Sequence, residues 1–262
     1  MKIRSLDDVS EILEKKPQDN SPKINLSEHS SDAMKLEIYQ PWANPVIKFK
    51  APESIIDEMM KVTDKLVDEN KKERDFSESL VGQVSKELKI NVTEDLTPNT
   101  SEFFTYCVGN FVHTALKQSY AAEEDKYAKF CNETMMVKIN SMWVVSQYPH
   151  EYNPIHIHTG CKVSSVMYLK VPKFKKDRKN IRKQSDMNKG IAGSDGQITF
   201  SNSTSADSGF ASPICSFTPK VGDMFVFASL QQHMVWPFRC DEEDKERRSV
   251  SFNADFTTGK RK

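Results

Sequence analysis

Two segments in the second half of the chain place three histidines and an arginine on short runs that have the character of β-strands. The first segment ends in His156-Ile-His158. The second contains His233, which follows the apolar run 223–227, and then Arg247 at the start of a further run. Histidines at this spacing restrict the fold, because the strands that carry them must meet at one place. The segments therefore favour an architecture of several short strands around a common interior.

From about residue 135 the sequence reads as strands separated by turn signals, at residues 135–146, 163–171, 197–200, 223–227 and 249–256. Before them, apolar residues recur at helical spacing over 52–71 and 101–122, and strand character is found at 36–42 and 45–50. A helical half followed by short strands predicts a mainly β protein with N-terminal helices, in which a β-sandwich or jelly roll is buttressed by helices.

The composition changes along the chain and suggests how it is organised. Residues 1–33 are polar, which predicts a flexible N-terminal arm. We expect residues 34–262 to form a single domain, with 34–134 as helical and strand support and 135–256 as the β core. The stretch 173–196 is rich in Lys and Arg. It is either a solvated loop or a lid that contacts an acidic substrate at the mouth of the site.

Charge and cysteine content exclude several classes of protein. Lys plus Arg number 37, and so do Asp plus Glu, so net charge gives no sign of a nucleic-acid or membrane partner. No apolar run approaches the roughly 20 residues of a membrane-spanning helix, and the N-terminus lacks the apolar core of a signal peptide. The 5 cysteines form no CxxC pair, which indicates reduced thiols. These features predict a cytoplasmic protein without a membrane partner.

The three histidines have the spacing of metal ligands. His156 and His158 are two residues apart on a predicted strand, so both side chains point to the same face. His233, at a strand-to-turn junction, is the natural third ligand. Three ligands on one side of an octahedral iron leave three positions for other molecules. Zinc held by three histidines and a water is the other chemistry that such a set supports.

A second group of polar residues is suited to bind a carboxylate. Arg247 and Ser249 are two residues apart on the strand after His233 and share a face. A guanidinium beside a hydroxyl can hold a carboxylate through charge-assisted hydrogen bonds. Tyr148 could donate a phenolic hydrogen bond to the same carboxylate, and Asn253 shares the face of Arg247.

The segments that carry these residues resemble the 2-oxoglutarate/Fe(II) oxygenase superfamily, and most of all a branch known mainly from marine bacteria and their phages. The resemblance covers about residues 135–256. It implies a double-stranded β-helix, which is a cupin-like jelly roll, with Fe(II), and with 2-oxoglutarate and O2 as cosubstrates. It also implies that His156 and His233 bind the metal, that Arg247 with Ser249 binds 2-oxoglutarate, and that Tyr148 is the cosubstrate-binding tyrosine of related hydroxylases.

The implied reaction is a hydroxylation coupled to decarboxylation of 2-oxoglutarate to succinate. The primary substrate is not encoded in any motif: a protein side chain, a nucleobase and a small metabolite all fit, and so does more than one oligomeric state. His158 stands where the superfamily usually has a carboxylate. It is either a third, neutral metal ligand or a residue that contacts the ligands without binding the metal. In the second case a water molecule would occupy the remaining coordination position.

Two other functions remain as alternatives. A cupin-type metal dioxygenase or metal-binding module would use three histidines without 2-oxoglutarate, but it would leave Arg247 and Ser249 without a role. A non-catalytic interaction protein on the same barrel is favoured by the missing carboxylate ligand. Binding of 2-oxoglutarate separates the first hypothesis from both alternatives, and metal content separates a metal protein from a non-catalytic one.

Overall fold

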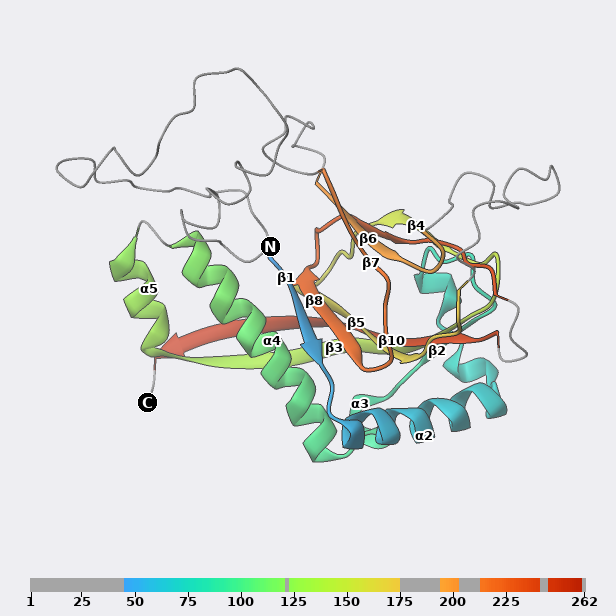
Figure 1. Ribbon diagram of the computed structural model, residues 1–262. Coiled ribbons are helices and arrows are strands. Elements are labelled where there is room, and N and C mark those ends of the chain that lie inside the picture. Colours follow the sequence, from blue (N-terminus) through green and yellow to red (C-terminus); the bar gives the residue numbers. More distant parts are fainter. Residues whose placement is uncertain (1–44, 121–122, 175–193, 203–212, 241–244, 261–262) are drawn as a thin grey trace, which may run out of the picture. The chain divides into compact units, whose positions relative to one another are not determined.

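A computed structural model describes residues 45–120, 123–174, 194–202, 213–240 and 245–260 (Figure 1). All of them fall within one compact unit, Gln40–Lys262. The predicted arm 1–33, the predicted strand 36–42 and most of the basic stretch 173–196 lie outside the described residues. The single domain 34–262 and its division into 34–134 and 135–256 therefore stay predictions.

The helices precede most of the strands, as the sequence predicts. The α-helices are α2 (Glu53–Glu69), α3 (Val92–Asp95), α4 (Pro98–Ser119) and α5 (Glu124–Cys131). Two short 3-10 helices, η1 (Lys72–Arg74) and η2 (Ser77–Ser79), follow α2. The strands are β1 (Val46–Lys50), β2 (Lys86–Lys89), β3 (Glu133–Gln147), β4 (Asn153–His156), β5 (Val163–Lys170), β6 (Ile198–Ser201), β7 (Ile214–Phe217), β8 (Asp223–Ala228), β9 (His233–Val235) and β10 (Arg247–Lys260).

The strands form two antiparallel sheets. The larger sheet has the order β1-β8-β5-β10-β3-β2, and the smaller has the order β4-β9-β6-β7. From β3 to β10 the chain crosses from one sheet to the other at every connection except the β6–β7 hairpin. This winding is a double-stranded β-helix, and the predicted class of a mainly β protein with N-terminal helices is confirmed.

Alternation along the strands builds two apolar layers. On β8, Met224 and Val226 point into the layer between the large sheet and the helices, whereas Phe225 and Phe227 point into the layer between the two sheets. Successive side chains of a strand face opposite ways, so this apolar run fills both layers at once. The interior between the sheets is where the pocket described below lies.

Helices α2 and α4 cover the face of the large sheet that points away from β4, β6 and β7 (Figure 1). Helix α4 begins three residues earlier than the sequence predicts, because Thr97 caps it by accepting a hydrogen bond from the Thr100 backbone N–H and because Pro98 suits the first helical turn. Among the described residues, no helix combines the length and the apolar content needed to cross a membrane.

Most of the expected elements are present. The predicted helix 52–71 corresponds to α2, and the predicted strands correspond to β1, β3, β5, β6, β8 and β10. Strands β2, β7 and β9 and helix α5 are not predicted. Each of these strands has only three or four residues, which is too few for a period to be recognised.

The contact between α4 and β10 tests the importance of the helix layer. Phe104 is fully buried, with its ring centroid 5.3 Å from that of Phe252. Phe104→Ala should lower the free energy of unfolding by about 3–5 kcal/mol, because it removes buried apolar surface and leaves a cavity. Tyr106→Ala on the same helix is the control, since Tyr106 is 65% exposed and its loss should change stability by at most about 0.5 kcal/mol. If urea denaturation gave equal losses of stability for the two variants, the packing of Phe104 against Phe252 would be contradicted.

Candidate functional site

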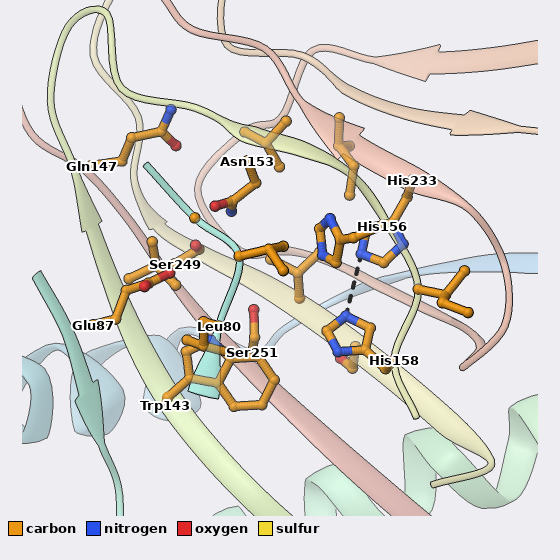
Figure 2. Close-up of a pocket in the computed structure, with 18 of the residues that line it drawn as sticks. Leu80, Glu87, Trp143, Gln147, Asn153, His156, His158, His233, Ser249 and Ser251 are labelled. Atoms are coloured by element: carbon orange, nitrogen blue, oxygen red, sulfur yellow. Dashed lines mark hydrogen bonds between the residues drawn. The ribbon is translucent and has the colours of Figure 1, made fainter. Parts of the chain in front are cut away.

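A pocket lies between the two sheets and brings together the polar residues of both sequence segments (Figure 2). Its walls come from β2, β3, β5, β8 and β10 of the large sheet and from β4, β6 and β9 of the smaller sheet. The segment 79–82 and the residues Ile157 and His158 after β4 complete them. The polar side chains that line it are those of Ser79, Glu87, Gln147, Asn153, His156, His158, Ser165, His233, Arg247, Ser249 and Ser251.

The three predicted metal ligands converge on one side of this pocket. The pairing of β4 with β9 sets His156 opposite His233. One ligand atom from each of His156, His158 and His233 lies within 4.8 Å of the others, and Nε2 of His158 is 3.3 Å from Nε2 of His233. Two nitrogens that bind one metal at right angles, each about 2.1 Å away, stand about 3.0 Å apart. The spacing therefore fits a shared metal ion.

His158 reaches the cluster by a different route from the one that the sequence predicts. Strand β4 ends at His156, so His158 does not lie on the same strand. Its backbone N–H donates to the carbonyl of Ser229, directly after β8, over 2.8 Å. The segment after β4 is thus held against the end of β8, and this contact, rather than strand alternation, brings the imidazole to the other two.

Backbone carbonyls orient two of the three imidazoles. Nδ1 of His156 donates to the Pro154 carbonyl over 2.7 Å, and Nδ1 of His233 donates to the Gln231 carbonyl over 2.9 Å. A carbonyl only accepts, so Nδ1 carries the proton and Nε2 keeps a lone pair for a metal. Burial lowers the pKa of His158 to about 4 and that of His233 to about 3. Both rings are therefore neutral at pH 7, as metal binding requires.

Arg247 is buried in the same pocket without a carboxylate partner among the described residues. Its side chain is 2% exposed, its Nη1 donates to Oε1 of Gln147 over 2.8 Å, and its guanidinium lies 4.8 Å from the centre of the Tyr168 ring. Its Nε has no hydrogen-bond partner there. Burial lowers the pKa of Arg247, which reflects the cost of removing this charge from water. The guanidinium therefore has an unused donor for an anion.

The other predicted cosubstrate residues divide into two groups. Ser249 lines the pocket beside Arg247, as expected, and Ser251 continues the same face. Tyr148 does not line the pocket: strand β3 ends at Gln147, whose side chain takes the inward position, and Tyr148 is 36% exposed. Asn253 is also outside the pocket, because six residues along β10 carry it roughly 20 Å from Arg247.

Sequence reasoning missed several residues of the site, and Glu87 is the most unusual of them. It lies on β2, is 3% exposed, and its Oε2 has no hydrogen-bond partner among the described residues. Burial, together with the nearby carboxylates of Asp75 and Glu151, raises the pKa of Glu87 to about 7. The run Lys86-Glu-Leu-Lys89 gives no sign of this in the sequence, because it reads as a polar surface segment.

The comparisons with known proteins bear on the part of the chain that holds most of this pocket. Residues 141–253 match the model of a family described as "Putative 2OG-Fe(II) oxygenase". The matched segment is less than half of the chain, but it contains the three histidines, Arg247 and Ser249. No curated protein sequence matches the chain.

Solved structures of oxygenases are similar to this chain at low sequence identity. An oxidoreductase of the 2OG-Fe(II) oxygenase family from Burkholderia pseudomallei is 13% identical, with a TM-score of 0.34, over 61% of this chain and 60% of that one. A prolyl-4-hydroxylase from Pseudomonas putida is 13% identical, with a TM-score of 0.46, over 84% of this chain and 94% of that one. A prolyl hydroxylase from Trichoplax adhaerens, in complex with a peptide fragment of hypoxia inducible factor, is 12% identical, with a TM-score of 0.43, over 80% of this chain and 83% of that one. The strand order of this chain, and not these scores, defines its fold.

The raised pKa of Glu87 predicts a dependence of stability on pH. Between the usual value of 4.5 and about 7, the folded state holds a proton that the unfolded state releases, so stability falls as pH rises through this window, by up to about 3 kcal/mol. Glu87→Gln mimics the protonated form. It should match the parent at pH 5 and be more stable at pH 8, as measured by urea denaturation at both values.

The matched control is Glu102→Gln, which alters an exposed carboxylate on α4 that does not line the pocket. Its stability relative to the parent should be the same at pH 5 and pH 8. If the stability difference between Glu87→Gln and the parent were the same at both pH values, Glu87 would not be a buried carboxyl that titrates between them.

Proposed function

We propose that the protein is a non-haem Fe(II) and 2-oxoglutarate-dependent dioxygenase, and that it hydroxylates its primary substrate. His156, His158 and His233 would hold Fe(II), and Arg247 with Ser249 would bind 2-oxoglutarate. The observation that carries the proposal is a buried arginine that has no carboxylate partner within the described part of the chain, in the same pocket as three converging imidazoles. The family match over residues 141–253 supports the same assignment.

The donor set fits the proposed metal. Neutral imidazoles bind Fe(II) as well as zinc, and three of them on one side leave positions free for a chelating cosubstrate. The hydrogen bonds of His156 and His233 to carbonyls fix the tautomer that presents Nε2. We include His158 as the third ligand because its Nε2 lies 3.3 Å from that of His233 with no other described acceptor or donor between them.

The environment of Arg247 fits an anionic cosubstrate. A buried guanidinium is stable only when its charge is compensated, and among the described residues it meets the amide oxygen of Gln147 and the Tyr168 side chain but no carboxylate. A carboxylate is the anion whose two oxygens match the donors of a guanidinium. Gln147 holds Nη1 in place, so the remaining donors keep their direction, and Ser249 offers a hydroxyl on the same face of β10.

Some pocket residues would bind the cosubstrate, and others would exclude water from the site. When bound, Fe(II) with 2-oxoglutarate and O2 supplies the oxidation of a C–H bond, and 2-oxoglutarate becomes succinate and CO2. Arg247 and Ser249 would orient the far carboxylate of 2-oxoglutarate. Apolar side chains of both sheets would limit the access of water: Val145, Val166, Ile198, Phe227 and Val235. The family match does not favour the cupin-type alternative, in which Arg247 would have no role.

A spectroscopic titration tests the cosubstrate site. The chain is purified without oxygen and loaded with Fe(II), and 2-oxoglutarate is added while the visible charge-transfer band of the chelate is recorded. Arg247→Ala should weaken 2-oxoglutarate binding on the order of 100-fold, because it removes a charged donor from a buried ion pair. Tyr148→Phe is the control and should leave the affinity within about twofold, since Tyr148 lies outside the pocket. A parent protein that binds iron but shows no band would refute the proposal.

The role of His158 has its own test in metal affinity. His158→Ala should weaken Fe(II) binding by more than about 100-fold, as measured by competition with a chromophoric chelator. A group behind the ligands typically changes affinity by only about 10- to 100-fold. His113→Ala is the control, because His113 is exposed on α4 and hydrogen-bonds Tyr127 instead. A loss of less than about 100-fold in His158→Ala would remove His158 from the ligand set.

A further inference from the structure

Glu87 and Asn153, which both line the pocket, have two buried oxygens without partners among the described residues (Figure 2). Among the described residues, neither Oε2 of Glu87 nor Oδ1 of Asn153 has a hydrogen-bond partner. Burying an acceptor without a partner is costly, and a carboxylate is the most costly of all. Native proteins satisfy nearly all such groups, so an exception inside a pocket suggests that a ligand completes it.

The two residues form one corner around a glycine. A Cβ on Gly82 would stand 2.4 Å from Oδ1 of Asn153 and 2.6 Å from Oε1 of Glu87. A side chain at this point would force the end of the Asn153 or Glu87 side chain to move, because real Cβ atoms do not approach other atoms so closely. Asp75 and Glu151 add negative charge close by, since both raise the pKa of Glu87. The corner therefore presents acceptors in a negative field, which suits a cation with hydrogen-bond donors.

The corner and the proposed cosubstrate residues are carried by different strands of the same pocket. Strand β3 lies between β2 and β10, and its Val145 pairs with Glu87 on one side and with Ser249 on the other. Glu87 and Arg247 have opposite charges and line the same pocket, but no ion pair between them is found among the described residues. Above a pH of about 7 the Glu87 carboxyl is ionised, and a negative corner disfavours the binding of anionic 2-oxoglutarate beside it.

The nearby pocket wall is apolar and partly open to solvent. Val81 is 50% exposed and Ile157 is 42% exposed, and both line the pocket. In the sequence, Val81 directly precedes Gly82, and Ile157 lies between His156 and His158. An aliphatic stem that passed along these side chains would lose contact with water while its polar end reached Glu87.

We propose that the primary substrate carries a basic nitrogen, as an ammonium or a guanidinium, at the end of an aliphatic stem, and that Glu87 with Asn153 binds this group. The inference rests on the proposed function, because it names the substrate of that same pocket. It assigns Glu87 to recognition: the carboxylate and the amide oxygen accept hydrogen bonds from the cation and hold the stem towards the metal site.

Three small probes test the preference for a cation in the full chain. N-butylguanidinium and n-butylammonium carry the charge, whereas N-butylurea is a neutral molecule of nearly the same shape as the first. Their affinities are measured by ligand-observed NMR at pH 8, with the protein metal-free and again with Fe(II) and 2-oxoglutarate under anaerobic conditions. The parent should bind at least one cation roughly 10- to 100-fold more tightly than the urea, as expected for hydrogen bonds to a charged group. Which cation binds more tightly distinguishes the two nitrogen groups.

Glu87→Gln should reduce this preference to within about threefold, because the amide keeps the shape of the side chain and removes its charge. Glu102→Gln, on the exposed face of α4, should keep the preference of the parent. The proposal is overturned if the parent binds no cation detectably, if cation and urea bind equally, or if Glu87→Gln keeps the preference. The charge-transfer band of the 2-oxoglutarate complex is recorded on the same samples, so a failure of the oxygenase assignment is seen separately from a failure of cation recognition.

Discussion

The central strand β10 is the constraint on which the rest of the site depends. It pairs with β3 on one side and with β5 on the other, so its side chains can only point to one face of the sheet or to the opposite face. The side chains of Val250 and Phe252 point to the face covered by the helices, where they pack in the hydrophobic core. Arg247, Ser249 and Ser251 are thereby directed into the pocket. A shift of one residue would exchange the two sets.

Two neighbouring arginines on this strand differ in whether their charge is neutralised by carboxylates of the described chain. Arg248 is 3% exposed and is held by Glu246, over 2.6 and 2.8 Å, and by Asp64 of α2. Arg247 is 2% exposed and, in the part of the chain that the structure describes, meets the amide oxygen of Gln147 and the ring of Tyr168 but no carboxylate. The two side chains are almost equally buried, but among these described residues carboxylates compensate the charge of Arg248 alone. The charge of Arg247 is available to a ligand.

Two buried glutamates show the same difference: one is surrounded by hydrogen-bond donors and the other is not. Glu246 accepts hydrogen bonds from Arg248, Ser146 and Lys170, which hold its pKa below the usual value despite its burial. Oε2 of Glu87 has no such donor among the described residues, and burial raises the pKa of Glu87 to about 7. The pocket thus contains a basic side chain on β10 and an acidic one on β2, with β3 between them, and neither has an oppositely charged partner in the described ranges. This polarity is the basis for placing an anionic cosubstrate and a cationic substrate in different parts of one cavity.

The sequence by itself determined the fold class, the two long helices and most of the strands, because periodicity acts over a few residues. The prediction that Arg247, Ser249 and the three histidines belong to one site rested in addition on the resemblance of their segments to a known superfamily. Only the tertiary structure decided which side chains enter the pocket. Tyr148 lies beyond the end of β3, and Asn253 lies too far along β10, although both share a motif with pocket residues. Glu87, Gln147 and Tyr168 were not foreseen, because their roles arise from strands whose paired residues lie about 60 to 100 positions apart in the chain. Burial and the absence of a partner are properties of that pairing, and no local pattern in the chain encodes them.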